Sequence, residues 1–463
     1  MDSKFFLETI RSEGLAQLSY VVGHQGRAAV IDPRRDVGVY VETARKYGAA
    51  VTHIFETHRN EDFVSGAQML SRLTGASVYH GRALDFEFGQ DVSDGASFDL
   101  GDMRLEVIET PGHTDESISI ALYDRSFGDA PVAVFTGDTL FIGDVGRTDF
   151  YPGRDEEVAG NLFDSIFEKL LPLGDQTILY PAHGAGSVCG AGMAAREFST
   201  LGYERRFNPR LKMTDRQAFI RFKVEEHHYK PPYFKQMELL NLEGTTFPYP
   251  DPRSPVPLSP SDFHDRMQRG MTAIDIRSPE AIGGATVPGS IGIPLNMLAS
   301  FAGWFLRHEQ PLGIVAENFG EVNQAVRHLA RIGYEDVDGY LEGGLTSWET
   351  GGFPYDRIPA VHARELVEWI QEKQDFVLLD VRGITEFEEE RLPGAQHVYV
   401  GELPGAIDTL DRRRPIVTFC GSGQRAIIAA SLLKGNGFES VSCCLGSLAA
   451  CKVVGCPIVE SED

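Results

Sequence analysis

Four short segments place a histidine or an aspartate directly after runs of residues typical of β-strands. They end in His58, His113, Asp138 and His183. A further carboxylate, Asp62, lies four positions after the first of these histidines. Strands that end at one edge of a sheet bring the residues after them together, so we expect these side chains to converge. Imidazole and carboxylate ligands delivered in this way suit iron, zinc or manganese.

A second group of residues that could take part in catalysis is the cysteine loop, Cys420-Gly421-Ser422-Gly423-Gln424-Arg425. The apolar run 414–419 before it predicts a strand, and residues 426–434 after it predict a helix. Such a loop wraps backbone N–H groups around the cysteine sulfur, and the helix N-terminus adds positive potential. Both effects favour a nucleophilic thiolate. The alternative for Cys420 is simple burial at the end of a strand.

The elements that position the first group alternate between strand-like and helix-like patterns. Strand-like runs are residues 17–23, 28–33, 49–55, 105–108, 132–135 and 177–180. Helix-like stretches are residues 36–47, a segment that starts near Ser65, and most of 153–171 and 190–243. This alternation is compatible with a four-layer αββα sandwich.

Six prolines between Pro248 and Pro260 predict an extended, semi-stiff connector. Beyond it the chain repeats itself at a nearly constant offset, which indicates a tandem duplication. The matching segments are 273–277 with 378–382, 287–289 with 392–394, and 343–348 with 446–451. Each copy alternates short strands with helices, which implies a parallel α/β sheet. We therefore expect a first domain at 1–247, the connector at 248–260, and repeats at 261–357 and 358–463.

The first repeat lacks the cysteine loop. Ala316 stands where the second repeat has Cys420, and the following segment 317–323 is acidic and contains no arginine. We also expect this segment to form a longer loop. Because no thiolate can form there, the first repeat is expected to be a spacer or a packing surface.

Composition limits the partners and the location. The chain has 463 residues and a formal net charge of −24, which argues against nucleic acid or an anionic membrane as a partner. No apolar run approaches the roughly 20 residues that span a bilayer, and the N-terminus does not resemble a signal peptide. Six cysteines, four of them after residue 440, do not predict a disulfide framework. We expect a cytoplasmic homo-oligomer.

The first group of motifs resembles the metallo-β-lactamase superfamily, whose first motif is usually His-x-His-x-Asp-His and whose fold is the αββα sandwich. In this chain Asn60 and Phe63 replace the second and the last histidine. The resemblance therefore implies that the second metal position is empty. What remains is His58, His113 and Asp138, the two-imidazole, one-carboxylate ligand set of non-haem Fe(II) oxygenases.

Within that superfamily the motifs resemble those of the persulfide dioxygenases. The resemblance covers residues 1 to about 245 and rests on segments 56–58, 110–114, 136–139, 146–149 and 180–183. It implies one Fe(II) per chain, with O₂ and a small-molecule thiol persulfide as substrates and with sulfite and free thiol as products. Glutathione, coenzyme A, bacillithiol and cysteine are all open as carriers of the persulfide.

The two repeats resemble rhodanese domains in their Asp-x-Arg and Gly-Gly-x-x-x-Trp signatures. The spacing from Cys420 to Arg425 matches the loop size of sulfurtransferases, whereas tyrosine-phosphatase-like loops are longer. The resemblance implies that Cys420 holds a persulfide and that Arg425, with the loop amides of 421–424, binds an anionic donor or acceptor. Transfer of sulfur from Cys420 to sulfite would give thiosulfate. With a dioxygenase, an inactive rhodanese and an active rhodanese in this order, the whole chain resembles a persulfide dioxygenase–sulfurtransferase of sulfide detoxification.

Four further residues have open roles. We expect Asp62 to orient a ligand histidine by a hydrogen bond rather than to bind metal. His183 contacts the substrate, orients a ligand or is structural. Arg147 clamps a substrate carboxylate or forms a structural ion pair. Cys189 faces the persulfide or is a small buried residue.

Two rival functions remain. One is a hydrolase of the glyoxalase-II or lactonase kind, which would use two metals to activate a bridging water. The other is a non-catalytic sulfur-binding sensor or scaffold. Metal content separates the first rival from the oxygenase, because one iron per chain is expected for the oxygenase and two metal ions for the hydrolase.

Overall fold

The computed structural model of the protein describes residues 4–187, 190, 192–245 and 252–460. Contacts divide the chain into two compact units. The first comprises residues 1–251 with 330–333, and the second comprises 252–329 with 334–463. No helix in the described ranges is both long and apolar enough to cross a membrane.

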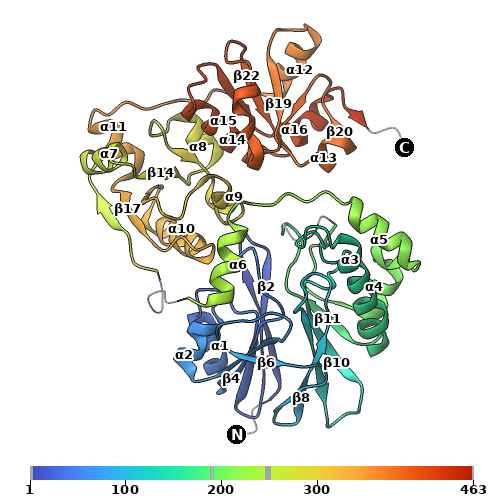
Figure 1. Ribbon diagram of the computed structural model, residues 1–463. Coiled ribbons are helices and arrows are strands. Elements are labelled where there is room, and N and C mark those ends of the chain that lie inside the picture. The colour runs from blue at the N-terminus through green and yellow to red at the C-terminus, as the bar shows by residue number, and fades with distance from the viewer. Residues whose placement is uncertain (1–3, 188–189, 191, 246–251, 461–463) are drawn as a thin grey trace. The chain divides into compact units, whose positions relative to one another are not determined.

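Two six-stranded β-sheets form the centre of the first unit (Figure 1). One sheet contains β1 (Phe6–Ser12), β2 (Gln17–His24), β3 (Arg27–Ile31), β4 (Ala50–Phe55), β5 (Ser77–Gly81) and β6 (Gln90–Val92), in that order. The other has the order β12 (Ser199–Thr200), β11 (Ile178–Pro181), β10 (Pro131–Gly137), β9 (Ile118–Asp124), β8 (Met103–Glu109) and β7 (Ser97–Leu100). Each strand-like run of the sequence overlaps one of these strands, with ends that differ by at most two residues where the run extends beyond the strand.

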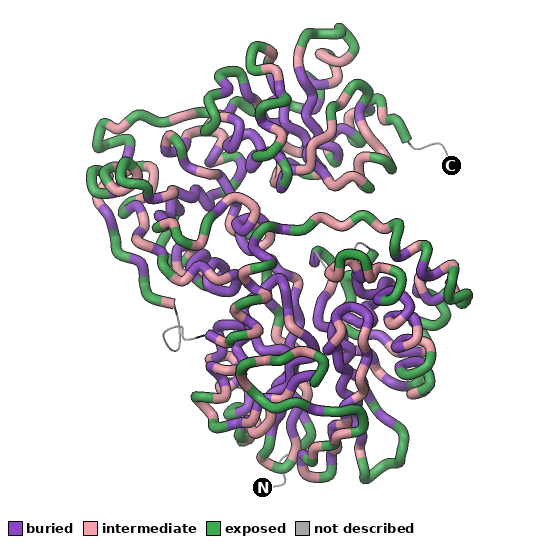
Figure 2. Tube along the Cα trace, in the orientation of Figure 1, coloured by how far each residue is buried: buried purple, intermediate pink, exposed green. Residues whose placement is uncertain are grey.

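Apolar side chains from both sheets form the core between them. Tyr20, Phe55 and Phe135 are among its buried members. Helices cover the two outer faces, and a separate apolar layer lies under each set of helices. The helices are α1 (Gly38–Lys46), α2 (Ala67–Thr74), α3 (Asp155–Asp164), α4 (Leu201–Phe207), α5 (Arg216–Glu225) and α6 (Phe234–Glu243). Figure 2 shows the central strands largely buried, whereas edge strands such as β6 and β7 are more exposed. The two sheets with helices on their outer faces confirm the predicted αββα sandwich.

Two five-stranded parallel sheets form the second unit, and both have the same order of strands. The first is β13 (Val256–Leu258), β17 (Val337–Leu341), β16 (Leu312–Val315), β14 (Thr272–Asp275) and β15 (Ile291–Gly292). The second is β18 (Ala360–Val361), β23 (Val441–Cys444), β22 (Ile416–Phe419), β19 (Val377–Asp380) and β21 (Gln396–His397). Equal strand order is what a tandem duplication predicts, and the parallel α/β prediction is confirmed.

Helices flank these sheets. In the first repeat they are α7 (Pro260–Gln268), α8 (Pro279–Gly284), α9 (Leu298–Phe305), α10 (Phe319–Arg331) and α11 (Gly344–Thr350). In the second they are α12 (Ala363–Gln371), α13 (Ile384–Glu389), α14 (Leu403–Ala406), α15 (Gln424–Gly435) and α16 (Ser447–Val454). Apart from residues 330–333, both repeats fall within one compact unit, and the division of the chain into four segments stays a prediction.

The proline-rich stretch is shorter as a connector than its composition suggests. Residues 256–258 form β13, which pairs in parallel with β17, and α7 begins at Pro260. Proline tolerates this edge position because an edge strand need not donate every backbone hydrogen bond. Residues 248–251 of the predicted connector lie outside the described part of the chain.

Residues 426–433 of helix α15 in the second repeat are all buried, and all but Ser431 are apolar. One side packs on β22 and β23 of its own sheet, and another packs on β15 and α8 of the first repeat. The Gly292 amide donates to Ser431 Oγ at 2.9 Å across this boundary, and the side chain of Ile427 lies near Gly283. The first repeat therefore provides one wall around the helix that follows the cysteine loop.

We predict that Ile427→Ala destabilises the second compact unit by about 2–5 kcal/mol, because it removes buried contacts at this boundary and leaves a cavity. The measurement is the unfolding transition of this unit by calorimetry of the full chain. Lys434→Ala on the same helix is the control, and its effect should stay within about 0.5 kcal/mol. Equal effects of the two substitutions would contradict the packing role.

Candidate metal centre and cysteine loop

The three predicted metal ligands and His183 follow four strands of the first unit. His58 follows β4, His113 follows β8, Asp138 follows β10 and His183 follows β11. β8 and β10 point the same way because both are antiparallel to β9, and β11 is parallel to β10. The polar residues at these strand ends come together, as the sequence predicts.

The distances define a compact group of side-chain atoms. The Nε2 atoms of His58 and His113 lie 3.8 Å and 3.6 Å from Asp138 Oδ2. All three residues are buried. Within the described residues these three atoms have no hydrogen-bond partner. Buried polar atoms are nearly always hydrogen-bonded, so this group requires an explanation.

Hydrogen bonds on the far side of each ring fix which nitrogen carries the proton. Thr57 Oγ1 donates to Asp32 Oδ2 at 2.8 Å and so accepts from His58 Nδ1 at 2.9 Å. The carbonyl oxygen of Arg147 accepts from His113 Nδ1 at 3.0 Å. In the neutral form of each ring the Nε2 atom therefore has the lone pair, which faces a carboxylate oxygen that is also an acceptor. Burial lowers the pKa of His58 to about 4, which keeps its ring neutral.

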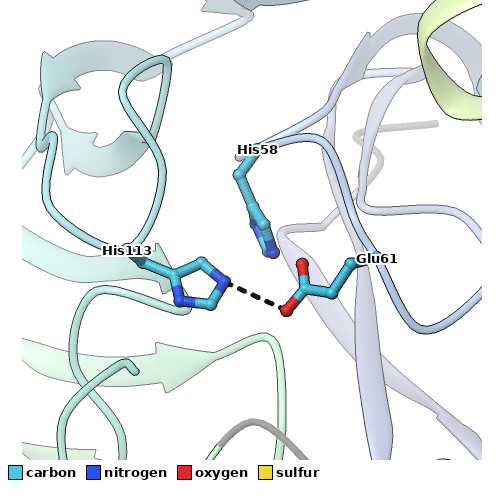
Figure 3. A group of neighbouring side chains, drawn as sticks. All are labelled: His58, Glu61 and His113. Carbon is cyan, nitrogen blue, oxygen red and sulfur yellow. Dashed lines mark ion pairs between the residues drawn. The ribbon is translucent and has the colours of Figure 1, made fainter. Parts of the chain in front are cut away.

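A fourth acceptor, which sequence reasoning missed, lies beside these atoms. Glu61 is 2% exposed, and its Oε1 lies 3.5 Å from His113 Nε2. Candidate ligand atoms of His58, Glu61 and His113 all lie within 4.8 Å of one another, as their side chains in Figure 3 illustrate. The only signal in the sequence is that Glu61 shares a short segment with His58. We refer to His58 Nε2, Glu61 Oε1, His113 Nε2 and Asp138 Oδ2 as the acceptor cluster.

The acceptor cluster fits a metal ion. Ligands about 2.1 Å from a tetrahedral metal lie about 3.4 Å apart, close to the separations observed here. Burial alone would lower the pKa of His113, but the carboxylates of Glu61 and Asp138 raise it above its usual value. The site therefore attracts positive charge, which a metal ion at its centre would supply.

Both ring nitrogens of His183 lie close to carboxylate oxygens. Its Nδ1 lies 2.7 Å from Asp138 Oδ1, and its Nε2 lies 3.0 Å from Asp62 Oδ2. Burial alone would lower the pKa of His183, but Asp138 and Asp62 raise it well above the usual value. The buried ring of Phe63 packs near His183. Asp62 thus faces His183 rather than one of the predicted ligand histidines.

Arg147 lies in a structural ion pair. Its Nε and a terminal nitrogen donate to both oxygens of Asp149 at 2.7 Å and 2.8 Å, and its side chain is fully buried. Of the two roles left open for Arg147, this geometry matches the ion pair. Its carbonyl also holds the His113 ring. Cys189 lies outside the described residues.

The cysteine loop connects β22 to α15 and closes around a sulfur atom. Cys420 is 1% exposed, and the amide of Gly423 donates to Cys420 Sγ at 3.1 Å. Gly423 adopts a φ of 102°, a conformation that favours glycine. The amides of Leu448 and Ala449 donate to the loop carbonyls of residues 420 and 421, each at 3.0 Å. The predicted wrapping of backbone amide around the sulfur is thus present at Gly423.

Ser447 supports the loop from α16, a contact that the sequence did not indicate. Its hydroxyl accepts from the Cys420 amide at 3.1 Å and donates to the Cys444 carbonyl at 2.6 Å. The first repeat has Gly344 at the corresponding helix start. Ser447 has a φ of 40°, so the backbone here is left-handed even without glycine. Cys443, Cys444, Cys451 and Cys456 are free and buried, as core packing predicts.

Arg425 is already paired with a carboxylate. Its two terminal nitrogens donate to the two oxygens of Glu386 on α13 at 2.6 Å and 2.7 Å. Burial would raise the pKa of Glu386, but the guanidinium lowers it below its usual value. An anion at the cysteine loop would therefore meet an arginine whose charge is largely balanced. The first repeat has Ala281 where the spacing from its Asp-x-Arg motif places Glu386, so that copy lacks both partners.

The loop of the first repeat is shorter than expected. β16 ends at Val315 and α10 begins at Phe319, whereas four residues separate β22 from α15. The expectation of a longer loop was therefore wrong. Asn318 Oδ1 accepts from the Glu321 amide, and Glu321 accepts from the Glu317 amide. This capping arrangement starts the helix early.

The αββα sandwich with ligand residues at its strand ends defines a metallo-β-lactamase-type protein, and the sequence comparisons agree. The sequence model of the metallo-β-lactamase superfamily matches residues 13–183, and that of the rhodanese-like domain matches residues 362–452. The mitochondrial persulfide dioxygenase ETHE1 of Bos taurus is 31% identical over 204 residues, which cover 42% of this chain and 72% of that protein. The chain belongs to the persulfide dioxygenase family of the metallo-β-lactamase superfamily and carries a rhodanese-like domain.

Two further relatives complete the comparison. The crystal structure of a metallo-β-lactamase from Staphylococcus aureus matches with a TM-score of 0.65 and 32% identity, and covers 73% of this chain and 98% of that one. The hydroxyacylglutathione hydrolase GloC of Haemophilus influenzae is 28% identical over 213 residues, which cover 41% of this chain and 90% of that protein. The Staphylococcus structure matches more of this chain than the first unit contains.

We predict that Thr57→Val weakens metal binding about 10- to 100-fold, the usual effect of losing a group that orients a ligand. Valine cannot accept a hydrogen bond from His58 Nδ1, so the ring loses its fixed orientation. The measurement is competitive titration of the apoprotein with Fe(II) or Co(II). Thr52→Val is the matched control, because Thr52 Oγ1 contacts His53 Nδ1 on β4 at 2.9 Å, outside the acceptor cluster. Equal affinities for the two variants would contradict this role of Thr57.

We predict that Glu386→Gln lowers the KM for sulfite several-fold in sulfur transfer from Cys420, because Arg425 would regain its uncompensated charge. The measurement is the rate of transfer from glutathione persulfide to sulfite at varied sulfite concentration. Glu388→Gln, an exposed position on the same helix, is the control. A sulfite KM equal to that of the control would show that the Glu386 carboxylate does not compete with the anion.

Proposed function

We propose that this protein is a persulfide dioxygenase with an attached sulfurtransferase. The first unit would bind one Fe(II) through His58, His113 and Asp138, and would oxidise a low-molecular-weight thiol persulfide with O₂. The cysteine loop would then move sulfane sulfur through Cys420. The coupled reactions would remove sulfide-derived persulfide and release thiosulfate.

The main support for this proposal is that His183 contacts two carboxylates. Both of its ring nitrogens face carboxylates, Asp138 on one side and Asp62 on the other. Asn60 and Phe63 stand where the superfamily usually has the remaining histidines of the second metal position. A second metal would lack its imidazole ligands, which supports a single-metal oxygenase over a two-metal hydrolase.

The residues of this chain would prepare the site in several ways. Fe(II), when bound, supplies the redox chemistry that allows O₂ to react with sulfur. Thr57 and Asp32 hold the His58 ring, and the Arg147 carbonyl holds the His113 ring, so both present lone pairs to the same point. His183 fixes the Asp138 carboxylate through its second oxygen. Burial of all these groups limits water near the reacting sulfur.

The atoms balance over the two steps. In the first unit one persulfide, RSSH, reacts with one O₂ and one water to give RSH, sulfite and two protons. At the cysteine loop a second RSSH transfers its outer sulfur to the Cys420 thiol, which releases RSH and leaves a Cys420 persulfide. Sulfite attacks that outer sulfur, the S–S bond breaks towards Cys420, and thiosulfate and the Cys420 thiolate are formed.

Further parts of the proposal concern the cell and the assembly. We place the protein in the cytoplasm, where small thiols carry persulfide, and we expect it to form a homo-oligomer. The persulfide carrier would be one of glutathione, coenzyme A, bacillithiol and cysteine. The high negative charge of the chain supports small-molecule partners over nucleic acid.

O₂ uptake tests the proposal most directly. We predict that protein purified without air and loaded with Fe(II) consumes O₂ with glutathione persulfide, and that His113→Ala abolishes this uptake because a ligand is lost. In Cys420→Ser uptake should persist, with the product shifted from thiosulfate to sulfite. Uptake is measured with an oxygen electrode, and products are measured by chromatography.

Two outcomes would contradict the proposal. The first is that the protein consumes no O₂ with any of the thiol persulfides, hydrolyses a thioester and binds two metal ions per chain. This outcome would identify the protein as a hydrolase. An unchanged product ratio in Cys420→Ser would remove the sulfurtransferase step and leave the oxygenase alone. Metal analysis of the same preparation provides the count of ions per chain.

A further inference from the structure

The segment between His58 and Asp62 provides more than the histidine. Glu61 is 2% exposed, and its Oε1 lies 3.5 Å from His113 Nε2, a distance similar to the 3.6 Å from that nitrogen to Asp138 Oδ2. Figure 3 shows the Glu61 side chain extending towards both histidine rings. Its carboxylate therefore stands next to the same nitrogen as the expected ligand Asp138.

The hydrogen bonds of His113 determine what can lie between these atoms. Because Nδ1 donates to the Arg147 carbonyl, the neutral ring has a lone pair at Nε2. The lone pair faces Glu61 Oε1, and two acceptors that face each other repel unless a cation lies between them. The same argument applies to Asp138 Oδ2. Both conflicts involve the same nitrogen, because His113 Nε2 lies 3.5 Å from Glu61 Oε1 and 3.6 Å from Asp138 Oδ2, so one cation beside this nitrogen would relieve both.

We propose that Glu61 is a fourth protein ligand of the metal, in addition to His58, His113 and Asp138. This inference rests on the proposed function only in requiring a single metal ion at the acceptor cluster. Two carboxylates and two neutral imidazoles balance the charge of a divalent ion, whereas the triad alone leaves one positive charge in a buried site. Four ligands also leave one open position fewer for O₂ and substrate.

Metal titration tests this proposal without any turnover. Apoprotein is titrated with Co(II), whose visible absorption reports the number and type of ligands, and affinity is measured by competition with a chelator. We predict that Glu61→Gln weakens Co(II) binding at least 10-fold and changes the visible spectrum, because a neutral amide is a poor ligand. Glu61→Ala should do the same, so either variant that folds decides the question.

Glu56→Gln is the matched control, because it changes another buried glutamate of the same segment outside the acceptor cluster. Glu56 Oε1 accepts from Ser65 Oγ at 2.6 Å, and burial raises its pKa well above the usual value, so the amide is a close substitute. Its affinity and its spectrum should match those of the wild type. Circular dichroism establishes that each variant is folded before titration.

The outcomes separate this inference from the proposed function. Weaker binding with a changed spectrum supports ligation by Glu61, whether or not the protein oxidises persulfide. An unchanged spectrum overturns the inference, with or without a loss of affinity, because Glu61 would then act only from outside the coordination sphere. Failure of the O₂-uptake assay alongside a changed spectrum would reject the oxygenase and retain the four-ligand site.

Discussion

The first unit depends on one physical constraint, which is that acceptor atoms face each other in a buried space. The nitrogen lone pairs of His58 and His113 and the carboxylate oxygens of Asp138 and Glu61 cannot satisfy one another. Removing such groups from water without compensation costs several kcal/mol. The sandwich brings these atoms together because four of its strands end near one another. A cation would compensate for the repulsion between the acceptor atoms. A metal ion bound at this site would therefore stabilise the folded unit.

A second constraint explains why the repeat without a cysteine is useful. Helix α15 follows the cysteine loop and must be held so that the loop keeps its shape around Cys420 Sγ. Its own sheet covers only part of this largely buried helix, and β15 and α8 of the first repeat cover another part. The first repeat contributes packing without chemistry, because Ala316 offers no nucleophile. This agrees with its expected role as a packing surface.

Much of this arrangement could be predicted from the sequence, because it depends on local patterns. Strand periodicity located the residues after each strand, and a short loop between strand and helix located Cys420. Glu61, Glu386 and Ser447 were missed for one physical reason. Each acts through the direction of its side chain towards a residue distant in sequence, and local pattern does not determine that direction. The loop at Ala316 was misjudged because helix capping, rather than loop composition, determines where α10 begins.

The two sites share one feature, which is a carboxylate placed to balance a positive charge. Glu386 balances Arg425 at the cysteine loop, and Glu61 would balance the metal ion in the proposed four-ligand site. The chain as a whole has a formal net charge of −24. Sulfite and thiosulfate are small dianions, and a strongly cationic site would retain them after the reaction. In the proposed reactions, compensated sites would bind these anions weakly, which would favour their release and make sulfur transfer to sulfite depend on the local sulfite concentration rather than on tight binding.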